Sequence, residues 1–302
     1  MSAPTVAAAD EGAADDETAD ERMSGGRPAD GRMADEGATD ADRGDAGASG
    51  LPVLRPDWSA PAHVAALCTT RAGGVSAPPY DSLNLGLHVG DDEDDVRENR
   101  ARLADRLGLP SAPHWLVQVH GTRVVRIGAT GPDEEGEADG AWTDVPDRVV
   151  GVLTADCLPV VVTDTAGTRV AVAHAGWRGL AGGVLDAALA PFEARSELHV
   201  WLGPAIGPQA FEVGAEVRAD FVGRDAAHAT AFVPLDAPGK YLADLYALAR
   251  RELERSRPVG SIHVSGGDRC TLHERERFHS HRRDGVRSGR MATLAWLHSP
   301  GR

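Results

Sequence analysis

Short runs of apolar residues interrupt the polar sequence after residue 50, and these runs predict β-strands. Several of the runs are continuous rather than alternating, which is typical of strands that are buried on both faces of a sheet. The predicted strands cover residues 64–69, 115–119, 149–153, 159–163, 169–173, 198–202, 262–264 and 293–297.

Three other stretches repeat their apolar residues at intervals of three or four, as amphipathic helices do. They cover residues 96–107, 180–189 and 242–253. We interpret each apolar stripe as core packing. Strands and helices in this mixture predict an α/β or α+β domain whose sheets are covered by helices.

The first 50 residues have a different composition from the rest of the chain. They contain 13 Asp and Glu and four Arg, but no Leu, Ile, Phe, Tyr or Trp. Such a segment cannot bury enough apolar surface to offset the entropy that it loses on ordering. We therefore predict a disordered acidic tail at residues 1–50. Residues 51–302 contain no Pro-, Gly- or Ser-rich linker, so we predict that they form a single domain.

Charge and cysteine content exclude several classes of protein. The formal net charge is −15 at pH 7, of which the tail contributes −9, and no basic cluster suited to nucleic acid occurs. The sequence shows no signal peptide and no apolar stretch of about 18 residues. Three widely spaced cysteines do not make a disulfide framework. We expect a soluble cytoplasmic protein that acts on small molecules, not on nucleic acid or membrane, and no motif implies a protein partner.

Three residues that can ligate a metal stand at the ends of predicted strands. His120 follows residues 115–119, Cys157 lies between two predicted strands, and His174 follows residues 169–173. If they converge, they form a site with three protein ligands and an open fourth position, as catalytic zinc usually has. Two imidazoles and one thiolate suit zinc, and copper less exclusively. Their separations of 37 and 17 residues match no short metal motif, so each alone could equally be a structural histidine or a buried cysteine.

The immediate neighbours of these candidate ligands suggest how each is presented. Pro159 interrupts the hydrogen bonding of a strand, so Cys157 should lie at a turn or bulge where side chains face a cleft. Asp156 could orient a neighbouring imidazole, carry a proton or cap the turn. Alternation in the run before His120 would bury Val119 and place the histidine on the opposite face.

The predicted strand before His174 continues into Ala-Gly-Trp-Arg-Gly, residues 175–179, and a helix follows. A turn between a strand and a helix offers backbone N–H groups to an anion, and Arg178 adds a positive charge. The glycines lack the spacing of a P-loop or of a dinucleotide-binding motif. We treat this turn as a candidate phosphate site, with a solvated Arg178 as the alternative.

Longer motifs along the chain match a known family. They are Cys-Thr-Thr-Arg-Ala-Gly-Gly-Val-Ser (68–76), Tyr-Asp-Ser-Leu-Asn-Leu-Gly (80–86), Gln-Val-His-Gly (118–121), Thr-Ala-Asp-Cys-Leu-Pro (154–159), Ala-His-Ala-Gly-Trp-Arg-Gly (173–179), Leu-Gly-Pro-Ala-Ile-Gly-Pro (202–208), Phe-Glu-Val-Gly (211–214), Gly-Gly-Asp-Arg-Cys-Thr (266–271), Arg-Arg-Asp (282–284) and Gly-Arg-Met-Ala (289–292). From about residue 51 to the C-terminus, the chain resembles the YfiH-like family. Its members were long called laccase-domain or polyphenol oxidase proteins and are now described as purine nucleoside phosphorylases.

The resemblance implies a fold, a metal site and an activity. The fold is a four-layer α-β-β-α sandwich shared with certain cysteine hydrolases, and the zinc ligands are His120, Cys157 and His174. The activity is phosphorolysis of adenosine, inosine, guanosine and S-methyl-5'-thioadenosine, with deamination of adenosine as a second activity.

The resemblance also implies substrate contacts. Arg71, Asn84 and Arg100 stand in matching motifs and are carried over as substrate-binding residues, beside Arg178 of the candidate phosphate turn. The chain departs from the family at His279, because relatives often carry two aromatic residues before the serine at this point. If an aromatic ring there stacks on the purine, His279 alters the preference for the base.

The residues suggest a mechanism, and three other functions compete with it. A metal would supply activated water or orient the substrate, Arg71 or Arg178 would neutralise phosphate, and the departing purine would be protonated. A copper polyphenol oxidase needs many paired histidines, and only one His-x-His pair, residues 279 and 281, occurs among the twelve. A metal-free hydrolase would use Cys157 as nucleophile and His174 as base. A non-catalytic sensor of nucleosides is the third alternative.

Overall fold

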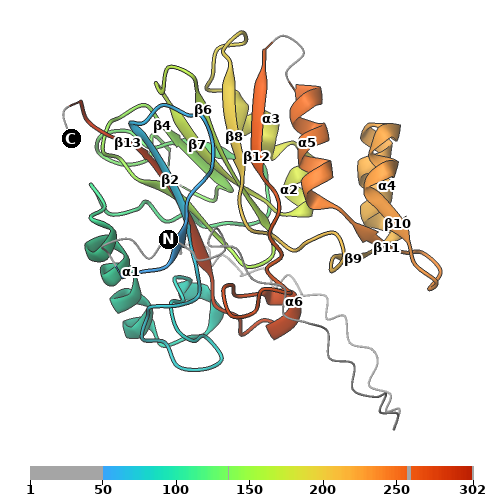
Figure 1. The fold of residues 1–302 in the computed structure, drawn as a ribbon, viewed down its shortest axis with the longest axis horizontal. Helices are drawn as coiled ribbons and strands as arrows, with labels where there is room; N and C mark the ends of the chain where they lie inside the picture. Colours follow the sequence, from blue (N-terminus) through green and yellow to red (C-terminus); the bar gives the residue numbers. More distant parts are fainter. Residues whose placement is uncertain (1–49, 135, 257–259, 301–302) are drawn as a thin grey trace, which may run out of the picture. The chain divides into compact units, whose positions relative to one another are not determined.

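The computed structural model describes residues 50–134, 136–256 and 260–300 (Figure 1). All of them belong to the unit Ala41–Arg302. The tail that we predict at residues 1–50 lies outside the described residues, apart from Gly50. The described residues form helices and several sheets, which confirms the mixed α/β class.

The largest sheet contains six strands. They are β3 (Val124–Arg126), β4 (Gly140–Thr143), β6 (Leu158–Asp164), β7 (Val170–Ala175), β8 (Leu198–Leu202) and β12 (Ile262–Gly266). Their order across the sheet is β12-β8-β6-β7-β4-β3. The central strands β6 and β7 are antiparallel and buried along their whole length, as their continuous apolar runs predict.

A second sheet contains four antiparallel strands. They are β1 (Val53–Leu54), β2 (Val64–Thr69), β5 (Val150–Thr154) and β13 (Met291–Leu297), in the order β1-β2-β13-β5. A smaller sheet joins β9 (Glu212–Gly214), β10 (Phe232–Pro234) and β11 (Lys240–Ala243). Strands β5 and β6 follow each other in the chain but belong to different sheets, so the turn between them connects the two large sheets.

The described helices are α1 (Glu93–Leu107), α2 (Trp177–Gly182), α3 (Val184–Leu189), α4 (Ala215–Arg224), α5 (Leu245–Ser256) and α6 (His281–Asp284), with the 3-10 helices η2 (Leu87–Val89) and η3 (Ala226–Ala231). Asp92 caps α1 by accepting hydrogen bonds from two backbone N–H groups of the first turn. Gly183, at φ +104°, divides the helix predicted at residues 180–189 into α2 and α3. Among the residues described, no helix combines the length and the apolar character needed to span a membrane.

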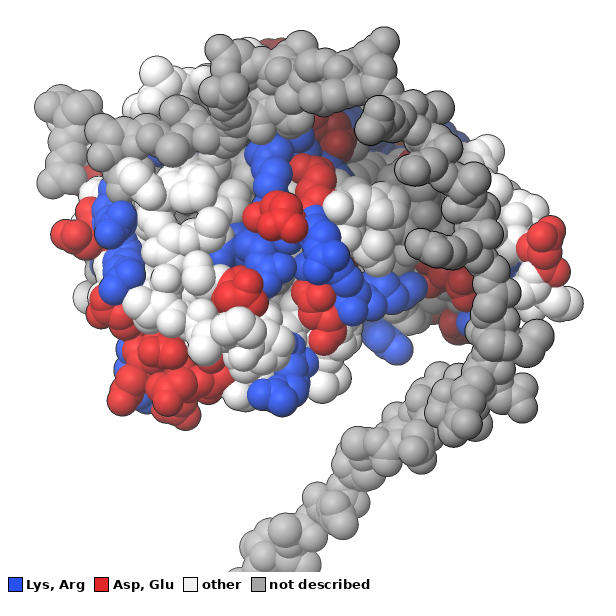
Figure 2. All heavy atoms as spheres, turned by 60° about the horizontal axis from the view of Figure 1, so that its bottom comes forward, with Lys and Arg blue, Asp and Glu red and all other residues white. Residues whose placement is uncertain are grey.

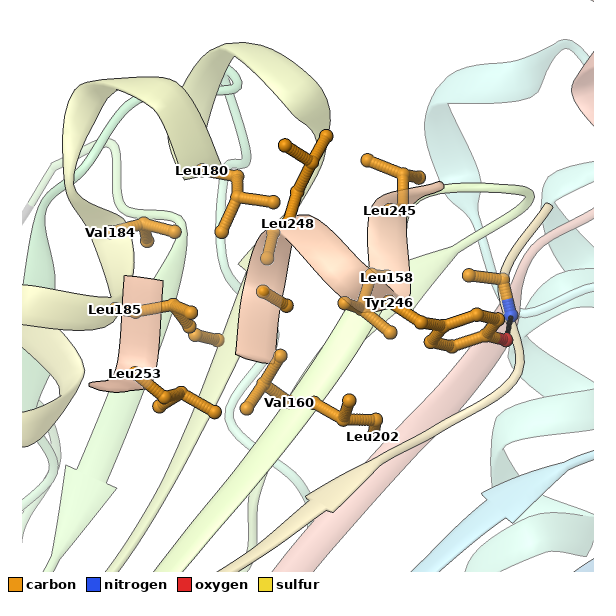
Figure 3. Close-up of a cluster of buried hydrophobic side chains, with 14 of the residues drawn as sticks. Leu158, Val160, Leu180, Val184, Leu185, Leu202, Leu245, Tyr246, Leu248 and Leu253 are labelled. Atoms are coloured by element: carbon orange, nitrogen blue, oxygen red, sulfur yellow. Dashed lines mark hydrogen bonds between the residues drawn. The ribbon is translucent and has the colours of Figure 1, made fainter. Parts of the chain in front are cut away.

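Buried side chains form three hydrophobic clusters. One packs α2, α3 and α5 against the six-stranded sheet and includes Leu180, Leu248 and Val160 (Figure 3). A second contains residues of both large sheets, for example Val152 of β5 and Val172 of β7. The third joins the other face of the four-stranded sheet to α1. Each large sheet therefore buries both of its faces.

One predicted strand, residues 115–119, is wrong. The segment forms only isolated bridges through His114 and Val117. Gln118 takes the place of strand pairing, because its side-chain amide exchanges two hydrogen bonds with the backbone of Leu153, at 2.9 and 2.7 Å. The prediction that Val119 is buried also fails, since 46% of its surface is exposed.

The other predicted elements are present, with their ends moved by a few residues. The strand at residues 64–69 keeps its bounds, the strand at 169–173 extends to Ala175, and the helix predicted at 242–253 begins only at Leu245. The sequence pattern missed short elements such as β3, β9 and β11, because three or four residues are too few to show a period.

Candidate metal centre

Strand register brings the three candidate ligands together. In the β6–β7 pair, Pro159 lies opposite His174 and Leu158 lies opposite Ala175. Cys157, which directly precedes β6, therefore stands beside the end of β7. This confirms the predicted turn between two buried strands, whereas His174 lies inside β7 and is buried. His120 reaches the same place from the irregular segment after residue 114.

The three side chains fit a metal with an open ligand position. The possible ligand atoms of His120, Cys157 and His174 all lie within 4.8 Å of one another. The Cys157 Sγ atom is 3.8 Å from Nε2 of His120, and ligand atoms around tetrahedral zinc are about 3.6 Å apart. His120 is exposed, Cys157 half-buried and His174 buried. The cluster is therefore open to solvent on the side of His120, where a fourth ligand can enter.

Asp139 holds both histidines, and the sequence analysis missed it. Its carboxylate accepts hydrogen bonds from Nδ1 of His174 at 2.8 Å and from the backbone N–H groups of His120 at 2.9 Å and Gly121 at 2.6 Å. Because Nδ1 of His174 donates to a carboxylate, its Nε2 is left to ligate a metal. The only available signal was an acidic residue directly before a short apolar run, which is a common pattern.

Electrostatics favour the thiolate form of Cys157. Burial alone would raise the pKa of Cys157, but the charge of His174 and hydrogen bonds from His120 and His174 lower it to about 6. For His174, burial alone would lower the pKa, whereas the Cys157 thiolate and Asp139 raise it to about 9. Burial would raise the pKa of Asp139, and its hydrogen bonds with His174 and backbone N–H groups lower it. In the metal-free site, thiolate and imidazolium stabilise each other near neutral pH.

Two glycines allow the ligands to approach the turn after β7. A Cβ atom on Gly176 would lie 3.0 Å from Sγ of Cys157 and 3.0 Å from Cδ2 of His120. A Cβ on Gly179 would lie 2.7 Å from the carbonyl oxygen of Gly121. Both glycines therefore serve close packing around the ligands. Arg178 between them is exposed and stacks on Trp177, with its guanidinium carbon 4.5 Å from the ring centre.

Asp156 does not orient a neighbouring imidazole, which was one of the roles predicted for it. It has φ +82°, and its carboxylate accepts hydrogen bonds from Thr271 Oγ1 at 2.5 Å, Ser280 Oγ at 3.0 Å and the backbone N–H of Arg282 at 2.6 Å. Asp156 thus fastens the segment before and within α6 to the turn that carries Cys157.

Two of the predicted substrate residues use their polar groups within the protein. Asn84 is buried, and its amide bonds Gly86, Asp91 and the backbone N–H of Arg290. Arg100 donates from Nε and Nη2 to the carbonyl of Leu85 and lies over a tryptophan ring at 4.3 Å. Burial lowers the pKa of Arg100 to about 10. Both residues hold the chain between residues 84 and 91.

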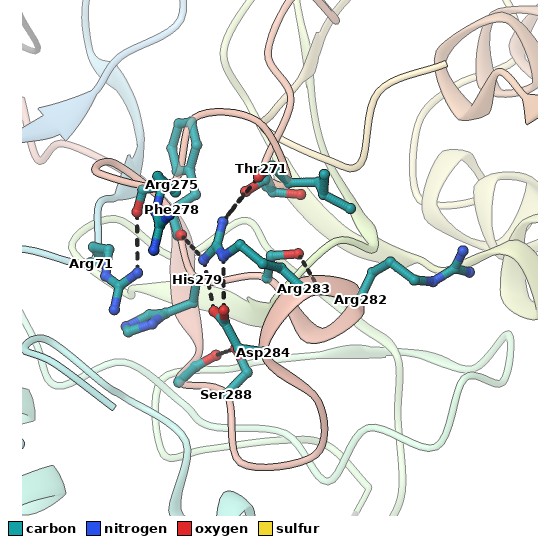
Figure 4. A network of polar contacts seen from close by, with 12 residues as sticks. Arg71, Thr271, Arg275, Phe278, His279, Arg282, Arg283, Asp284 and Ser288 are labelled. Carbon is teal, nitrogen blue, oxygen red and sulfur yellow. Dashed lines mark hydrogen bonds and ion pairs between the residues drawn. The ribbon is translucent and has the colours of Figure 1, made fainter. Parts of the chain in front are cut away.

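Arg71 lines a pocket whose lining contains none of the three candidate metal ligands. Lys and Arg gather on the face that carries α6, with Asp and Glu among them (Figure 2). There a hollow of about 620 Å³ is lined by Arg71, Asp81, Arg275, Arg283 and Asp284, among others. The guanidinium of Arg71 bonds the backbone and carboxylate of Asp81, at 2.8 and 3.1 Å, and the carbonyl of Arg275, at 3.1 Å (Figure 4). Its three nitrogens thus each have a protein partner.

His279, where the sequence departs from the family pattern, is fully buried. No described residue accepts or donates a hydrogen bond at either of its ring nitrogens. Its ring packs so closely on Gly289 that a Cβ there would be 2.5 Å away. In this arrangement the ring of His279 is covered by protein, whereas His281, two residues later, is exposed.

Comparisons with known proteins place this site in a family. The family model "Multi-copper polyphenol oxidoreductase laccase" matches residues 65–298. The chain is 52% identical to purine nucleoside phosphorylase YfiH of Escherichia coli over 247 residues, covering 81% of this chain and 98% of that protein. It is 46% identical to the purine nucleoside phosphorylase of Haemophilus influenzae over 250 residues, covering 82% and 100%.

Solved structures with the same fold support this family assignment. Neisseria meningitidis protein NMB0706 superposes with a TM-score of 0.74 and 48% identity over 82% of this chain and 99% of that one. YlmD from Geobacillus stearothermophilus superposes with a TM-score of 0.71 and 32% identity over 82% and 96%. With this fold, with the His120, Cys157 and His174 cluster, and with relatives matched along almost their whole length, the chain belongs to the YfiH-like family of laccase-domain proteins.

Proposed function

We propose that this protein is a zinc-dependent purine nucleoside phosphorylase. The observation that carries the proposal is an open three-ligand cluster in a chain about half identical to proteins named purine nucleoside phosphorylase. The proposed substrates are adenosine, inosine, guanosine and S-methyl-5'-thioadenosine, together with phosphate. The proposed products are the free base and a ribose 1-phosphate.

The residues of the chain prepare the site for this chemistry. Cys157 is a thiolate at neutral pH, because its pKa is about 6, and Asp139 orients His174 through its Nδ1. Zinc held by His120, Cys157 and His174 would supply a Lewis acid for either reaction. An oxygen of hydrogen phosphate forms a bond to C1' of the ribose while the bond to the purine nitrogen breaks, and the departing purine takes up the proton that the phosphate loses.

Deamination of adenosine is the proposed second activity. Water adds to the purine carbon that carries the amino group, and ammonia leaves. The open side of the His120, Cys157 and His174 cluster would admit the oxygen nucleophile of either reaction, phosphate or water. The substrate-binding residues proposed from the family motifs are Arg71, Asn84 and Arg100, with Arg178 beside the metal ligands. Asn84 and Arg100 serve by holding the chain between residues 84 and 91.

Purified zinc-loaded protein tests the proposal. Adenosine and inosine are incubated with and without phosphate, and free base, ribose 1-phosphate and ammonia are measured. We expect base release that depends on phosphate, and we expect Cys157→Ala to lose both activities while remaining folded. Cys270→Ala is the matched control, because Cys270 is another half-buried free cysteine and contributes no ligand to the cluster. Full activity in Cys157→Ala would reject the metal centre.

A metal-free hydrolase is the second candidate, favoured by one observation. Cys157 and His174 form a thiolate–imidazolium pair without a metal, as a nucleophile and its base do. Alkylation of Cys157 in active, metal-free protein would support this candidate. The copper oxidase named by the family model is less favoured, because the described residues contain one metal-ligand cluster, whereas a multicopper site needs several histidine pairs.

We also propose the finer fold description and the cell compartment. The three hydrophobic clusters support a four-layer α-β-β-α sandwich of the cysteine-hydrolase type, with α1 on one side and α2, α3 and α5 on the other. A reducing cytoplasm would keep the thiol of Cys157 available for the metal.

A further inference from the structure

Arg290 lies next to the turn that carries the Cys157 ligand, and part of its guanidinium has no hydrogen-bond partner among the described residues. It directly precedes β13, in which Met291 pairs with Thr154, the last residue of β5. The next three residues of that chain are Ala155, Asp156 and Cys157. Register alone therefore brings Arg290 opposite the turn that presents the thiolate ligand.

The backbone and stem of Arg290 are fixed. Its backbone N–H donates to Oδ1 of Asn84 at 2.9 Å, and Nη1 donates to the carbonyls of Ser288 and Gly289 at 2.7 and 3.1 Å. Its Cγ lies 2.8 Å from where a Cβ of Gly86 would be. A side chain held at so many points has already lost its rotamer entropy, so a ligand that binds it pays little for ordering.

The remaining donors of Arg290 are free. No described residue accepts a hydrogen bond from its Nε or Nη2, although Arg290 is half-buried. Arg71 differs, because its nitrogens bond Asp81 and Arg275. Arg178 also differs, because it is exposed and stacks on Trp177. Of these three arginines, Arg290 combines a fixed position near the ligands with two adjacent donors that can bind an anion.

Arg100 and His88 lie at the same turn as Arg290. Arg100 donates to the carbonyl of Leu85, and His88 and Arg290 both lie against Gly86, with Cε1 of His88 3.5 Å from its Cβ position. The positive charges of Arg290 and Arg100 act together on His88, after burial, to lower its pKa. Burial lowers the pKa of Arg290, and the charges of Cys157, Asp156 and Tyr80 oppose this.

The charges of Arg290 and His120 both act on His281. Burial and the charge of Arg290 lower its pKa, Asp156 opposes them, and Arg282 and His120 add to the lowering. His281 is exposed. By the β13–β5 register, an anion held by Arg290 would lie next to the turn that presents Cys157.

We propose that Arg290, beside the turn at residues 84–88, binds the phosphate that attacks the nucleoside. This inference rests on the proposed phosphorylase function and assigns a residue to its second substrate. Nε and Nη2 of Arg290 donate to two phosphate oxygens, as the planar guanidinium does with phosphate elsewhere. Asn84 is then a positioning residue, because its carbonyl oxygen fixes the backbone of Arg290.

The test compares Arg290→Gln with Arg97→Gln in zinc-loaded protein. Arg97 lies on α1, is exposed, and pairs only with neighbouring carboxylates, so it is the matched control. With inosine as substrate, we expect the KM for phosphate to rise about tenfold or more in Arg290→Gln and to stay within about twofold in Arg97→Gln. The KM for inosine and the zinc content should stay near the wild-type values. Titration calorimetry with inorganic phosphate should show the same loss of affinity.

The outcomes separate this inference from the proposed function. If the wild-type protein releases no base in a phosphate-dependent way, the phosphorylase proposal fails, whatever the variants do. If it does release base and Arg290→Gln keeps the wild-type KM for phosphate, the assignment of Arg290 is wrong. A larger rise in Arg71→Gln or Arg178→Gln than in Arg290→Gln would also overturn it. If Arg290→Gln does not fold, Arg290→Lys replaces it in the test. Lysine keeps the charge and the aliphatic stem but cannot donate two parallel hydrogen bonds, so its KM for phosphate must rise about fivefold.

Discussion

Buried His279 makes the folded protein sensitive to acid, and replacing it should remove part of that sensitivity. The ring is fully buried and lies beside Arg71 and Asp284 (Figure 4). Burial, and then the positive charge of Arg71, lower the pKa of His279 from 6.5 to about 3, although Asp284 opposes them. The ring is therefore neutral in the folded protein at any pH well above 3.

The magnitude follows from proton linkage. The unfolded chain protonates this histidine as pH falls through 6.5, but the folded chain does not until about 3. Stability from the neutral ring is thus fully present above pH 6.5 and is lost as pH falls towards 3. Between pH 7.5 and 5.0 the loss in unfolding free energy is about 2 kcal/mol.

The assay is urea unfolding of metal-free protein at both pH values, since a bound metal adds its own proton linkage. We expect His279→Phe to lose about 2 kcal/mol less than the wild type on acidification. If phenylalanine does not fit against Gly289, the variant His279→Leu is measured in place of His279→Phe. The control is His273→Gln, because His273 is exposed and its removal tests for a general effect of losing a histidine. An acid-induced loss equal to that of the wild type in both buried-site variants would refute the reasoning.

Three more predictions concern the metal centre. Asp139→Asn should weaken zinc about 10- to 100-fold in chelator competition, because the group that orients His174 is lost; unchanged affinity would contradict this role. Gly176→Ala should also weaken zinc while leaving the urea midpoint nearly unchanged, since the new methyl group presses on Cys157 and His120. In metal-free protein, the rate of Cys157 alkylation should rise with a midpoint near pH 6, where its thiolate forms, and a midpoint above 8 would disprove the stabilised thiolate.

Continuous apolar runs predicted the central strands well, for a physical reason. Strands β5, β6, β7 and β13 are buried along their whole length, so no polar face had to be inferred. The segment before His120 misled the pattern because two of its valines are exposed: Val117 has 62% of its surface exposed and Val119 46%. There the side chain of Gln118 pairs with the backbone of Leu153, a contact that a hydrophobicity pattern does not contain.

The sequence identified the candidate metal ligands but not the residues around them, Asp139 and Arg290. His120, Cys157 and His174 are chemically distinctive residues at strand ends, and motif order connects them. Asp139 became visible only through its hydrogen bonds. Arg290 is one of 30 arginines, and only the β13–β5 register brings it opposite the turn before Cys157. Long-range pairing, which determines both positions, has no local signature.

One carboxylate, that of Asp139, holds the ring of His174 and the backbone at His120 at once. The two histidines are therefore preorganised: the entropy of ordering them is lost when the sheets form, not when an ion arrives. Metal uptake should then leave the surrounding strands in place. For anyone redesigning this centre, His120 and His174 behave as one mechanical unit, and moving either without rebuilding Asp139 would displace the other.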